Sequence, residues 1–453
     1  MSLNKILYLP VETAARELDA KLLMALFASG HGFKVIVGSH VRIHNRIHQF
    51  TPGIYIGHLF NRRKKRIFSI LRDLGFAIAA WDEEGLAWIN AETYSRRRVC
   101  PQTLAMVERV YAWGEQQAEA MGDIARKAGL HIKILGNPRQ DILSPLLRPL
   151  HAERAARLQR ELGDFILFNS NFGWINHARN PRVSLTRTDE ELTAIAALSG
   201  HDESYVRFRY EIFRAFCRLL TQVAQAMPER TIVVRPHPSE NHEIWRQATQ
   251  GLKNVVIRAD ADLVPWLMAA GAMIHNGCTT AVESALLDKP SIMYRPIDGG
   301  RFEIRQPLET SILAETGEEV LALLRKNQPP PEAIRRIHDN LSSMVAQWNR
   351  GLASERIARD LEDMFQTANP QASLPLRLRG QLHARARAMV KAYKARFSPK
   401  SSSNPAYIDQ KFPHMDIREI RTRLETLARL VKLPTPDVQQ LDSRLWRVTP
   451  PRP

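Results

Sequence analysis

Two polar segments in the second half of the chain combine residue types that could bind a phosphate. One reads Arg-Pro-His-Pro-Ser-Glu over residues 235–240, and the other reads His-Asn-Gly-Cys-Thr-Thr-Ala-Val-Glu over residues 275–283. In the second segment Gly277 permits a tight turn, Thr279 and Thr280 offer hydroxyl groups, and the first amides of a following helix could donate to an anion. In the first, His237 between two prolines could donate to the same phosphate or to a nucleotide. The alternative for this histidine is a buried, hydrogen-bonded side chain at a strand end.

Apolar runs that read as strands precede both segments. The chain opens with a strand-helix-strand unit, in which apolar runs at 5–10 and 33–38 flank a helical pattern at 12–29. The alternation continues, and a second series of strands begins at 165–168. This alternation of strands and helices is typical of parallel sheets covered by helices on both faces. Both polar segments should then lie at the carboxyl edge of a sheet, where such folds bind ligands.

The alternation also predicts how the chain divides into domains. We expect a first α/β domain at residues 1–145 and a second at 146–365, with an insertion near 178–228 made of a polar loop and one long helix. Residues 366–453 form a basic, mostly helical C-terminal extension.

Six motifs occur in order over residues 5–345. They are LPVETAARELDAKLLMALFASGHGFKVIVG at 9–38, DEEG at 82–85, GNPRQD at 136–141, FNSNFGWIN at 168–176 and the two segments described above. With these motifs the chain resembles the surface carbohydrate (surface polysaccharide) biosynthesis family, which includes retaining β-Kdo transferases that use CMP-Kdo. The resemblance implies a GT-B-like α/β fold, in which two Rossmann-like, doubly wound parallel-sheet domains face a cleft.

The resemblance assigns the acceptor and catalytic groups to the first domain and the nucleotide-sugar donor to the second. Glu283 is similar to the acid that many GT-B enzymes place on the nucleotide ribose. The alternative is an ordinary acid in a first helical turn, interacting with the helix dipole. The residues expected to bind the nucleotide are Arg235, His237, Pro238, Asn276, Gly277, Thr279, Thr280 and Glu283.

Retention through double displacement needs two carboxylates, one that forms the covalent intermediate and one that moves protons. Glu83 and Glu84 are the candidates for proton transfer, and the resemblance favours Glu84, because it directly precedes Gly85, the position that the catalytic acid of that family normally takes. Asp141 is the candidate nucleophile. The alternatives are a polar turn with an exposed acidic cluster for residues 82–85, and an N-cap of a helix at 142–147 for Asp141.

Further polar residues are candidates for contacts to the sugar or the acceptor. They are Glu12, Arg16, Asn169, Asn171 and Asn176. The first two could instead pair with each other across one helical turn, and the asparagines could serve turn chemistry. We expect neither a metal nor a cofactor, because no Asp-x-Asp-like pair follows a strand and the His and Cys residues lack ligand spacing.

The composition bounds the class of protein. With 453 residues and 44% hydrophobic residues the chain can bury full cores, and its net charge of +17 favours polyanionic partners. Three scattered cysteines indicate no disulfide framework, and the N-terminus has no signal-peptide pattern. The longest apolar stretch, 263–274, is too short for a spanning helix, which needs about 20 residues. We therefore expect a cytoplasmic protein whose membrane contact, where present, is peripheral on the inner face of the cytoplasmic membrane.

The basic stretch at 377–400 holds eight lysines and arginines and no acid. It is either a solvated helix or loose tail, or a peripheral anchor on anionic lipid. Nucleic-acid binding is not expected, because Tyr393 and Phe397 are too few for a stacking platform. If the stretch is an anchor, removal of the residues after about Leu374 should abolish binding to anionic vesicles while leaving turnover of a soluble acceptor largely intact.

These observations predict a glycosyltransferase that moves Kdo or a related 2-keto sugar acid from a CMP-activated donor to a glycan or glycolipid acceptor. The alternatives within enzymes are an inverting transferase of the CMP-sialic acid type and one of the glycerophosphotransferase type. The nonenzymatic alternative is a basic polyanion-binding scaffold of a capsule assembly complex.

Overall fold

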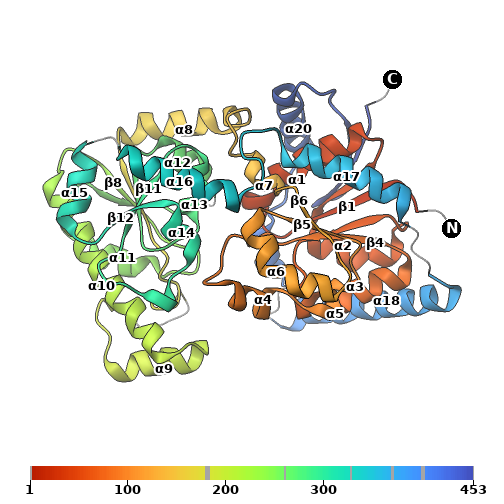
Figure 1. Ribbon diagram of the computed structural model, residues 1–453, viewed down its shortest axis with the longest axis horizontal. Helices are drawn as coiled ribbons and strands as arrows, with labels where there is room; N and C mark the ends of the chain where they lie inside the picture. Colours follow the sequence, from red (N-terminus) through yellow and green to blue (C-terminus); the bar gives the residue numbers. More distant parts are fainter. Residues whose placement is uncertain are drawn as a thin grey trace. The chain divides into compact units, whose positions relative to one another are not determined.

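The computed structural model describes residues 3–178, 184–259, 262–326, 329–368, 372–398 and 404–451. They form two compact units, each built around its own sheet (Figure 1). Unit 1 comprises Met1–Leu86, Ala91–Leu150 and Ser342–Pro453, and unit 2 comprises Ala87–Asn90 and His151–Leu341.

Unit 1 contains an eight-stranded sheet in the order β13-β14-β2-β1-β3-β4-β5-β6. The strands are β1 (Ile6–Val11), β2 (Lys34–Ser39), β3 (Ile54–Gly57), β4 (Ala77–Trp81), β5 (Arg109–Ala112), β6 (Ile132–Ile134), β13 (Asp437–Asp442) and β14 (Leu445–Thr449). Strands β1 to β6 pair in parallel, as the alternation of the sequence predicts. Their nearly continuous apolar runs are explained by burial of both faces of the sheet.

Helices cover both faces of this sheet. One face packs against α1, α17 and α20, and the other carries α2, α3 and α18. The helices of unit 1 are α1 (Ala14–Gly30), α2 (His40–Arg46), α3 (Lys65–Leu74), α4 (Ala91–Arg98), α5 (Pro101–Leu104), α6 (Glu115–Lys127), α7 (Pro138–Asp141), α17 (Ala353–Thr367), α18 (Leu374–Phe397), α19 (Pro405–Lys411) and α20 (Ile417–Val431), with 3₁₀ turns at Ile47–Gln49 and Arg62–Lys64.

Unit 2 contains a six-stranded parallel sheet in the order β12-β11-β10-β7-β8-β9. The strands are β7 (Ile166–Asn169), β8 (Ile232–Arg235), β9 (Val255–Ile257), β10 (Ala272–His275), β11 (Ser291–Tyr294) and β12 (Ser311–Ala314). Its helices are α8 (Pro149–Leu162), α9 (Asp189–Ser199), α10 (Glu203–Ala226), α11 (His242–Ala248), α12 (Val264–Ala269), α13 (Thr280–Leu286), α14 (Arg305–Glu309), α15 (Gly317–Lys326) and α16 (Pro331–Met344), with a 3₁₀ turn at Gly300–Phe302.

The region of the expected insertion is more helical than its sequence suggested. Residues 179–183 of its polar loop lie outside the described residues. After them, α9 begins with a capping box between Thr188 and Glu191, and it buries Leu192 and Ala196 against α10. The apolar pattern of α9 is short, so the sequence predicts a loop there, while α10 coincides with the expected long helix.

The C-terminal segment is not a separate extension, which differs from the expected division at residue 366. Strand β14 pairs antiparallel with β2, and Trp446 stacks on Phe412 with the ring centroids 6.0 Å apart. Gly38 of β2 permits this pairing, because a Cβ there would lie 2.2 Å from the Arg444 carbonyl oxygen. Truncation after Leu374 would remove two strands and part of the core, so the structure now predicts that such a protein loses stability and turnover.

Candidate functional site

Three neighbouring strands of unit 2 end in register, and their ends carry three of the polar motifs. Asn169 at the end of β7 pairs with Arg235 of β8 on one side and with His275 of β10 on the other. Because parallel strands all end at the same edge of the sheet, the segments 235–240 and 275–283 emerge side by side. This edge is the candidate donor half-site.

A chain of hydrogen bonds joins the three segments. Nη1 of Arg235 donates to Oδ1 of Asn169 over 3.5 Å, and Nδ2 of Asn169 donates to Oγ1 of Thr280 over 2.9 Å. Arg235 is buried within the half-site. The structure therefore brings together an arginine, an amide and a hydroxyl that the sequence assigned to one site from positions more than 40 residues apart.

Asn276 fixes the turn before α13 to the loop after β7. Its Oδ1 accepts from the backbone N–H of Asn171 at 3.0 Å, and its Nδ2 donates to the Asn171 carbonyl at 3.3 Å. Gly277 follows with a φ of +86°, in the left-handed region that favours glycine. Thr279 occupies the N-cap position of the seven-residue helix α13, and Glu283 lies half-buried in its first turn.

His275 shapes this turn, a role that sequence analysis did not assign. Its Nδ1 accepts from the backbone N–H groups of Gly277 and Cys278 at 3.1 and 3.2 Å. That leaves Nε2 as the protonated nitrogen, which donates to Oγ of Ser311 at 2.9 Å. Burial lowers the pKa of His275 to about 3, so the ring stays neutral and holds the turn.

His237 is exposed, so the alternative of a buried histidine is wrong. Its Nδ1 lies 2.8 Å from Oγ of Ser239, and its backbone N–H donates to Oε1 of Glu240 at 3.0 Å. Pro238 beside it is also exposed. The imidazole is thus exposed to solvent on a loop that the contacts with Ser239 and Glu240 hold in place.

Glu240 braces that loop from inside, and sequence analysis missed it. Its buried carboxylate also accepts from the backbone N–H of Phe172 at 3.0 Å and from Nε1 of Trp245 at 2.9 Å. Burial raises the pKa of Glu240, against the lowering effect of these donors. Asn176 lies on the same side of the loop, where its amide donates to the Asn241 carbonyl at 3.1 Å. This contact favours a role for Asn176 in stabilising the loop over a contact to the sugar.

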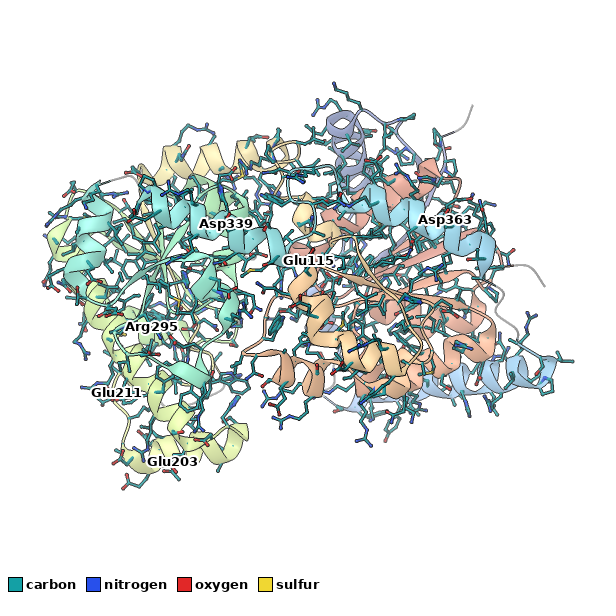
Figure 2. The ribbon with its side chains drawn as sticks, viewed as in Figure 1. Glu115, Glu203, Glu211, Arg295, Asp339 and Asp363 are labelled. Atoms are coloured by element: carbon teal, nitrogen blue, oxygen red, sulfur yellow. The ribbon has the colours of Figure 1, made fainter. Side chains whose placement is uncertain are left out.

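A cavity of about 140 Å³ opens within unit 2 beside Asn171, Asn276 and Gly277. The helix α10 supplies one wall, over the stretch marked by the labels Glu203 and Glu211 in Figure 2. The other lining residues are Trp174, Tyr205, Phe208, Arg209, Ile212, Met293, Tyr294, Arg295, Phe302, Glu303 and Ile304.

Arg209 is the principal residue of this cavity that sequence analysis missed. Its guanidinium donates to the carbonyl oxygens of Asn171 and Asn276, the latter at 3.3 Å, and lies 5.2 Å from the Phe172 ring centroid. Tyr205, Phe208, Arg209 and Ile212 follow the 3–4 residue spacing of a helix face. In the sequence that spacing indicates only a buried face, so it gave no signal of a cavity.

In unit 1, the acidic turn after β4 separates two neighbouring glutamates into different environments. Glu83 is buried, with Oε1 2.5 Å from Nζ of Lys21 and 2.6 Å from Nε1 of Trp81. Burial raises the pKa of Glu83, but Lys21 and Arg139 outweigh it and hold the pKa below its usual value. Glu84 is 39% exposed and pairs with Nη2 of Arg16 at 2.8 Å.

Asp82 in the turn and Glu12 before the first helix also have hydrogen-bonding or ion-pair partners. Asp82 is buried and accepts from Nε of Arg98 at 2.9 Å and from the Tyr94 hydroxyl at 3.1 Å, which fixes the turn. Glu12 lies 3.4 Å from Nε2 of His58, so the alternative of a Glu12–Arg16 pair is wrong. The alternative of an exposed acidic cluster at residues 82–85 is also wrong for Asp82 and Glu83.

The buried His58 and the half-buried Lys64 lie near Glu12, and sequence analysis missed both. Nζ of Lys64 lies 2.7 Å from Nε2 of His58, and burial lowers the pKa of Lys64 to about 8. The bond to His58 holds the pKa of Glu12 below its usual range despite the opposing effect of burial. Glu12, His58 and Lys64 come from the ends of β1 and β3 and from the turn before α3, so only the sheet brings them together.

Asp141 is the last residue of α7, and it caps a different helix from the one expected. Its two carboxylate oxygens accept from the backbone N–H groups of Ala353 at 2.8 Å and Ser354 at 2.7 Å, at the start of α17. Asn137 caps α7 itself, and residues 142–147 form turns rather than a helix, so the alternative of an N-cap on a helix at 142–147 is wrong. Asp141 is 2% exposed, and burial raises its pKa to about 6.

The segment 136–141 nevertheless lies beside the acidic turn. Nη1 of Arg139 donates to the carbonyl oxygen of Glu83 at 2.7 Å, and the Arg139 guanidinium lies 5.7 Å from the Trp113 ring centroid. The three predicted catalytic acids thus belong to two adjoining segments of unit 1. Within the described residues, no group of three or more His, Cys, Asp or Glu side chains is arranged to hold a metal ion.

The buried pair of Lys21 and Glu83 yields a prediction about stability. Replacing Lys21 by Met should leave Glu83 and the neighbouring Glu17 as uncompensated buried acids, which costs about 3–5 kcal/mol in the free energy of unfolding. Urea denaturation measures this. Lys5→Met is the matched control, because the Lys5–Glu362 pair is partly exposed and should contribute at most about 1 kcal/mol. Equal losses in the two variants would contradict the prediction.

Comparisons with known proteins bear on the fold. No family model matches the chain, and no curated protein is similar to it. The chain is similar to a solved structure from Listeria monocytogenes described as a UDP-N-acetylglucosamine 2-epimerase, with 12% identity, a TM-score of 0.51, and coverage of 82% of this chain and 98% of that one. At this identity the similarity shows the fold alone.

Two further solved structures are similar to the chain with TM-scores below 0.5. One is a UDP-GlcNAc 2-epimerase from Neisseria meningitidis (11% identity, TM-score 0.49, 79% of this chain and 99% of that one). The other is the wall teichoic acid polymerase TagF (13% identity, TM-score 0.39, 64% of this chain and 69% of that one). The two Rossmann-like units, together with the similarity to the Listeria structure, confirm the predicted fold class: the chain has a GT-B-like fold.

Proposed function

We propose that the chain is a glycosyltransferase that moves Kdo, or a related 2-keto sugar acid, from a CMP-activated donor to a glycan or glycolipid acceptor of the cell surface. The observation that carries the proposal is the register of Asn169, Arg235 and His275, with the hydrogen bonds that run from Arg235 through Asn169 to Thr280. The preference for CMP and for Kdo rests on the resemblance of the motifs.

In this proposal unit 2 binds the nucleotide part of the donor. Transfer from a CMP-sugar breaks the bond between the anomeric carbon and the phosphate oxygen, and negative charge develops on the released CMP. Arg235, His237 and the hydroxyls of Thr279 and Thr280 supply one charged and several neutral donors that could stabilise this leaving group without a metal. The cavity beside Asn276 suits the remainder of the nucleotide, because its aromatic walls and Arg209 combine apolar contact with directed donors.

Unit 1 supplies the acids. Glu84 is the proton-transfer group of this proposal, because its carboxylate reaches solvent, whereas that of Glu83 is bound to Lys21 inside the unit. Glu83 then acts as a positioning residue, since it fixes Trp81 and the turn that carries Glu84. Asp141 remains the proposed nucleophile on the strength of the motif 136–141.

Binding of CMP tests the donor half-site. CMP should raise the melting temperature, because a ligand that binds only the native state stabilises it by about 2.7 kcal/mol at 100 times its Kd. UMP, UDP and AMP should do less. His237→Ala should reduce the shift, whereas His242→Ala, a histidine of the nearby helix α11, should keep it.

The outcomes of this test separate the alternatives. An unchanged CMP shift and full activity in His237→Ala would contradict the assignment of the donor half-site. Release of CMP from CMP-sialic acid but not from CMP-Kdo would favour the sialyltransferase type. A protein that is stabilised by UDP alone and turns over UDP-GlcNAc would overturn the proposal in favour of a sugar-nucleotide epimerase.

We also propose that the protein works in the cytoplasm, in peripheral contact with the membrane that carries its acceptor. No helix among the described residues is both long and apolar enough to span a bilayer. The contact is therefore proposed for a surface of the folded chain.

A further inference from the structure

Helix α18 presents a row of large apolar side chains to solvent. Seven of them are each between 50% and 71% exposed, namely Leu374, Leu378, Leu382, Met389, Val390, Tyr393 and Phe397. At 100° per residue they fall within an arc of roughly 160° around the helix. We call this arc the α18 stripe. No described part of the chain covers these seven side chains.

The opposite face of α18 holds the helix against unit 1. Gly380 and Ala384 are buried there, and a Cβ on Gly380 would lie 2.9 Å from Cβ of Asp73 in α3. Arg379 forms a bidentate pair with Asp73 at 2.6 and 2.9 Å, and Gln381 donates to the His48 carbonyl at 3.1 Å. Figure 1 shows α18 alongside α3 for this reason. The stripe is therefore the outward face of a docked helix rather than part of a loose tail.

Basic side chains lie within and beside the stripe. Arg385 and Arg396 lie within the arc of the stripe and Lys394 lies about 40° beyond its edge; all three are exposed, and the helix contains no acid. Exposed large apolar side chains with basic ones among and beside them, on a helix that contains no acid, suit contact with the surface of an anionic membrane. Lysines and arginines there attract anionic headgroups, and the apolar side chains enter the acyl boundary. A protein partner would need a matching acidic groove, and nothing in the composition of the stripe favours one.

We propose that the α18 stripe is a membrane-docking surface that binds the chain to anionic lipid. Lys400 of the basic stretch lies outside the described residues, and the proposal does not use it. The inference deepens the membrane contact proposed above. It is tested without donor or acceptor, so its failure and the failure of the proposed transferase activity are distinguishable.

Vesicle sedimentation with the full chain tests the stripe. The wild-type protein should bind vesicles of phosphatidylcholine and phosphatidylglycerol, and bind pure phosphatidylcholine vesicles far more weakly. The triple variant Leu378→Gln, Leu382→Gln and Met389→Gln should bind at least about 100-fold more weakly, because insertion of each side chain contributes on the order of tenfold. Glutamine is a good helix former, so the helix should persist.

A second triple variant tests the charges. Arg385→Gln, Lys394→Gln and Arg396→Gln should weaken binding by roughly 100-fold, since each basic residue near an anionic surface contributes about fivefold. The matched control for this variant is Arg157→Gln, Arg160→Gln and Arg325→Gln, which removes the same charge from exposed positions of unit 2. The control for the stripe is Ile134→Gln, Leu146→Gln and Leu198→Gln, at exposed apolar positions elsewhere.

Three results would overturn the proposal. The first is equal loss of binding in the variants and their controls, which would assign any binding to the net charge or the apolar content of the whole surface. The second is equal binding to neutral and anionic vesicles. The third is a wild-type dimer in analytical ultracentrifugation that the stripe variant converts to a monomer, with no vesicle binding, because the stripe would then be an interface between two copies.

Discussion

Glu84→Gln is expected to slow CMP release from CMP-Kdo by about 10²- to 10⁴-fold, the usual loss when a group that transfers a proton is removed. Glutamine keeps the size of the side chain and can still accept from Arg16, so the fold should be retained. The Arg16–Glu84 pair is partly exposed, and its weakening should change the free energy of unfolding by at most about 1 kcal/mol. Steady-state kinetics and a melting curve on the same preparation measure both effects.

Glu115→Gln is the matched control for Glu84, because Glu115 is an exposed acid at the start of α6 in the same unit (Figure 2). It should keep wild-type turnover. A Glu84→Gln protein with turnover within a few-fold of wild type would remove Glu84 from the mechanism. Glu83→Gln would then be the next variant to compare, although loss of the charge that faces Lys21 should also lower its stability.

Asp141→Asn is expected to abolish transfer and also to lower the melting temperature. The amide nitrogen of asparagine would face one of the two backbone N–H donors at the start of α17, and one buried donor would lose its acceptor. Such a loss costs about 1–3 kcal/mol. The stability effect follows from the contacts, and the effect on transfer follows from the proposed role as nucleophile.

Asp360→Asn separates the two roles of Asp141. Asp360 is a buried acid of α17 that accepts from the Tyr111 hydroxyl at 2.9 Å, so its variant should lose stability while keeping turnover. Mass spectrometry of Glu84→Gln mixed with CMP-Kdo should show a covalent sugar adduct on the peptide that contains residues 136–143. Folded Asp141→Asn protein that is still active, with no adduct and an inverted product anomer, would leave Asp141 as a helix cap and contradict double displacement.

Much of the fold followed from local pattern. Apolar runs of four to six residues alternate with helical spacing, and burial of both faces makes such runs strands of a parallel sheet. The same pattern predicted that the candidate donor half-site lies at one edge of the second sheet. Arg235 and His275 each end a run of this kind, on either side of the strand that ends at Asn169, and polar residues that follow parallel strands must meet at one edge.

The sequence could not separate Glu83 from Glu84, because neighbours in one turn have the same local pattern. The difference comes from Lys21, which lies 62 residues away and binds only Glu83. Arg209 was missed for a related reason. Its spacing on α10 indicates a buried face, and only packing against the loops after β7 and β10 turns that face into a cavity wall.

The C-terminal segment shows most clearly which features local sequence patterns could not predict. Its charge predicted a basic region, and the absence of acids in α18 is a property of composition alone. The pairing of β14 with β2 and the burial of Trp446 were not predictable, because they join residues about 400 positions apart through the edge of a sheet that the first residues build. The periodicity of a helix or strand shows which of its faces is apolar. What that face packs against depends on elements that lie far away in the sequence. Asp141 is a further example, because it accepts from the backbone N–H of Ala353 at the start of α17, more than 200 residues later.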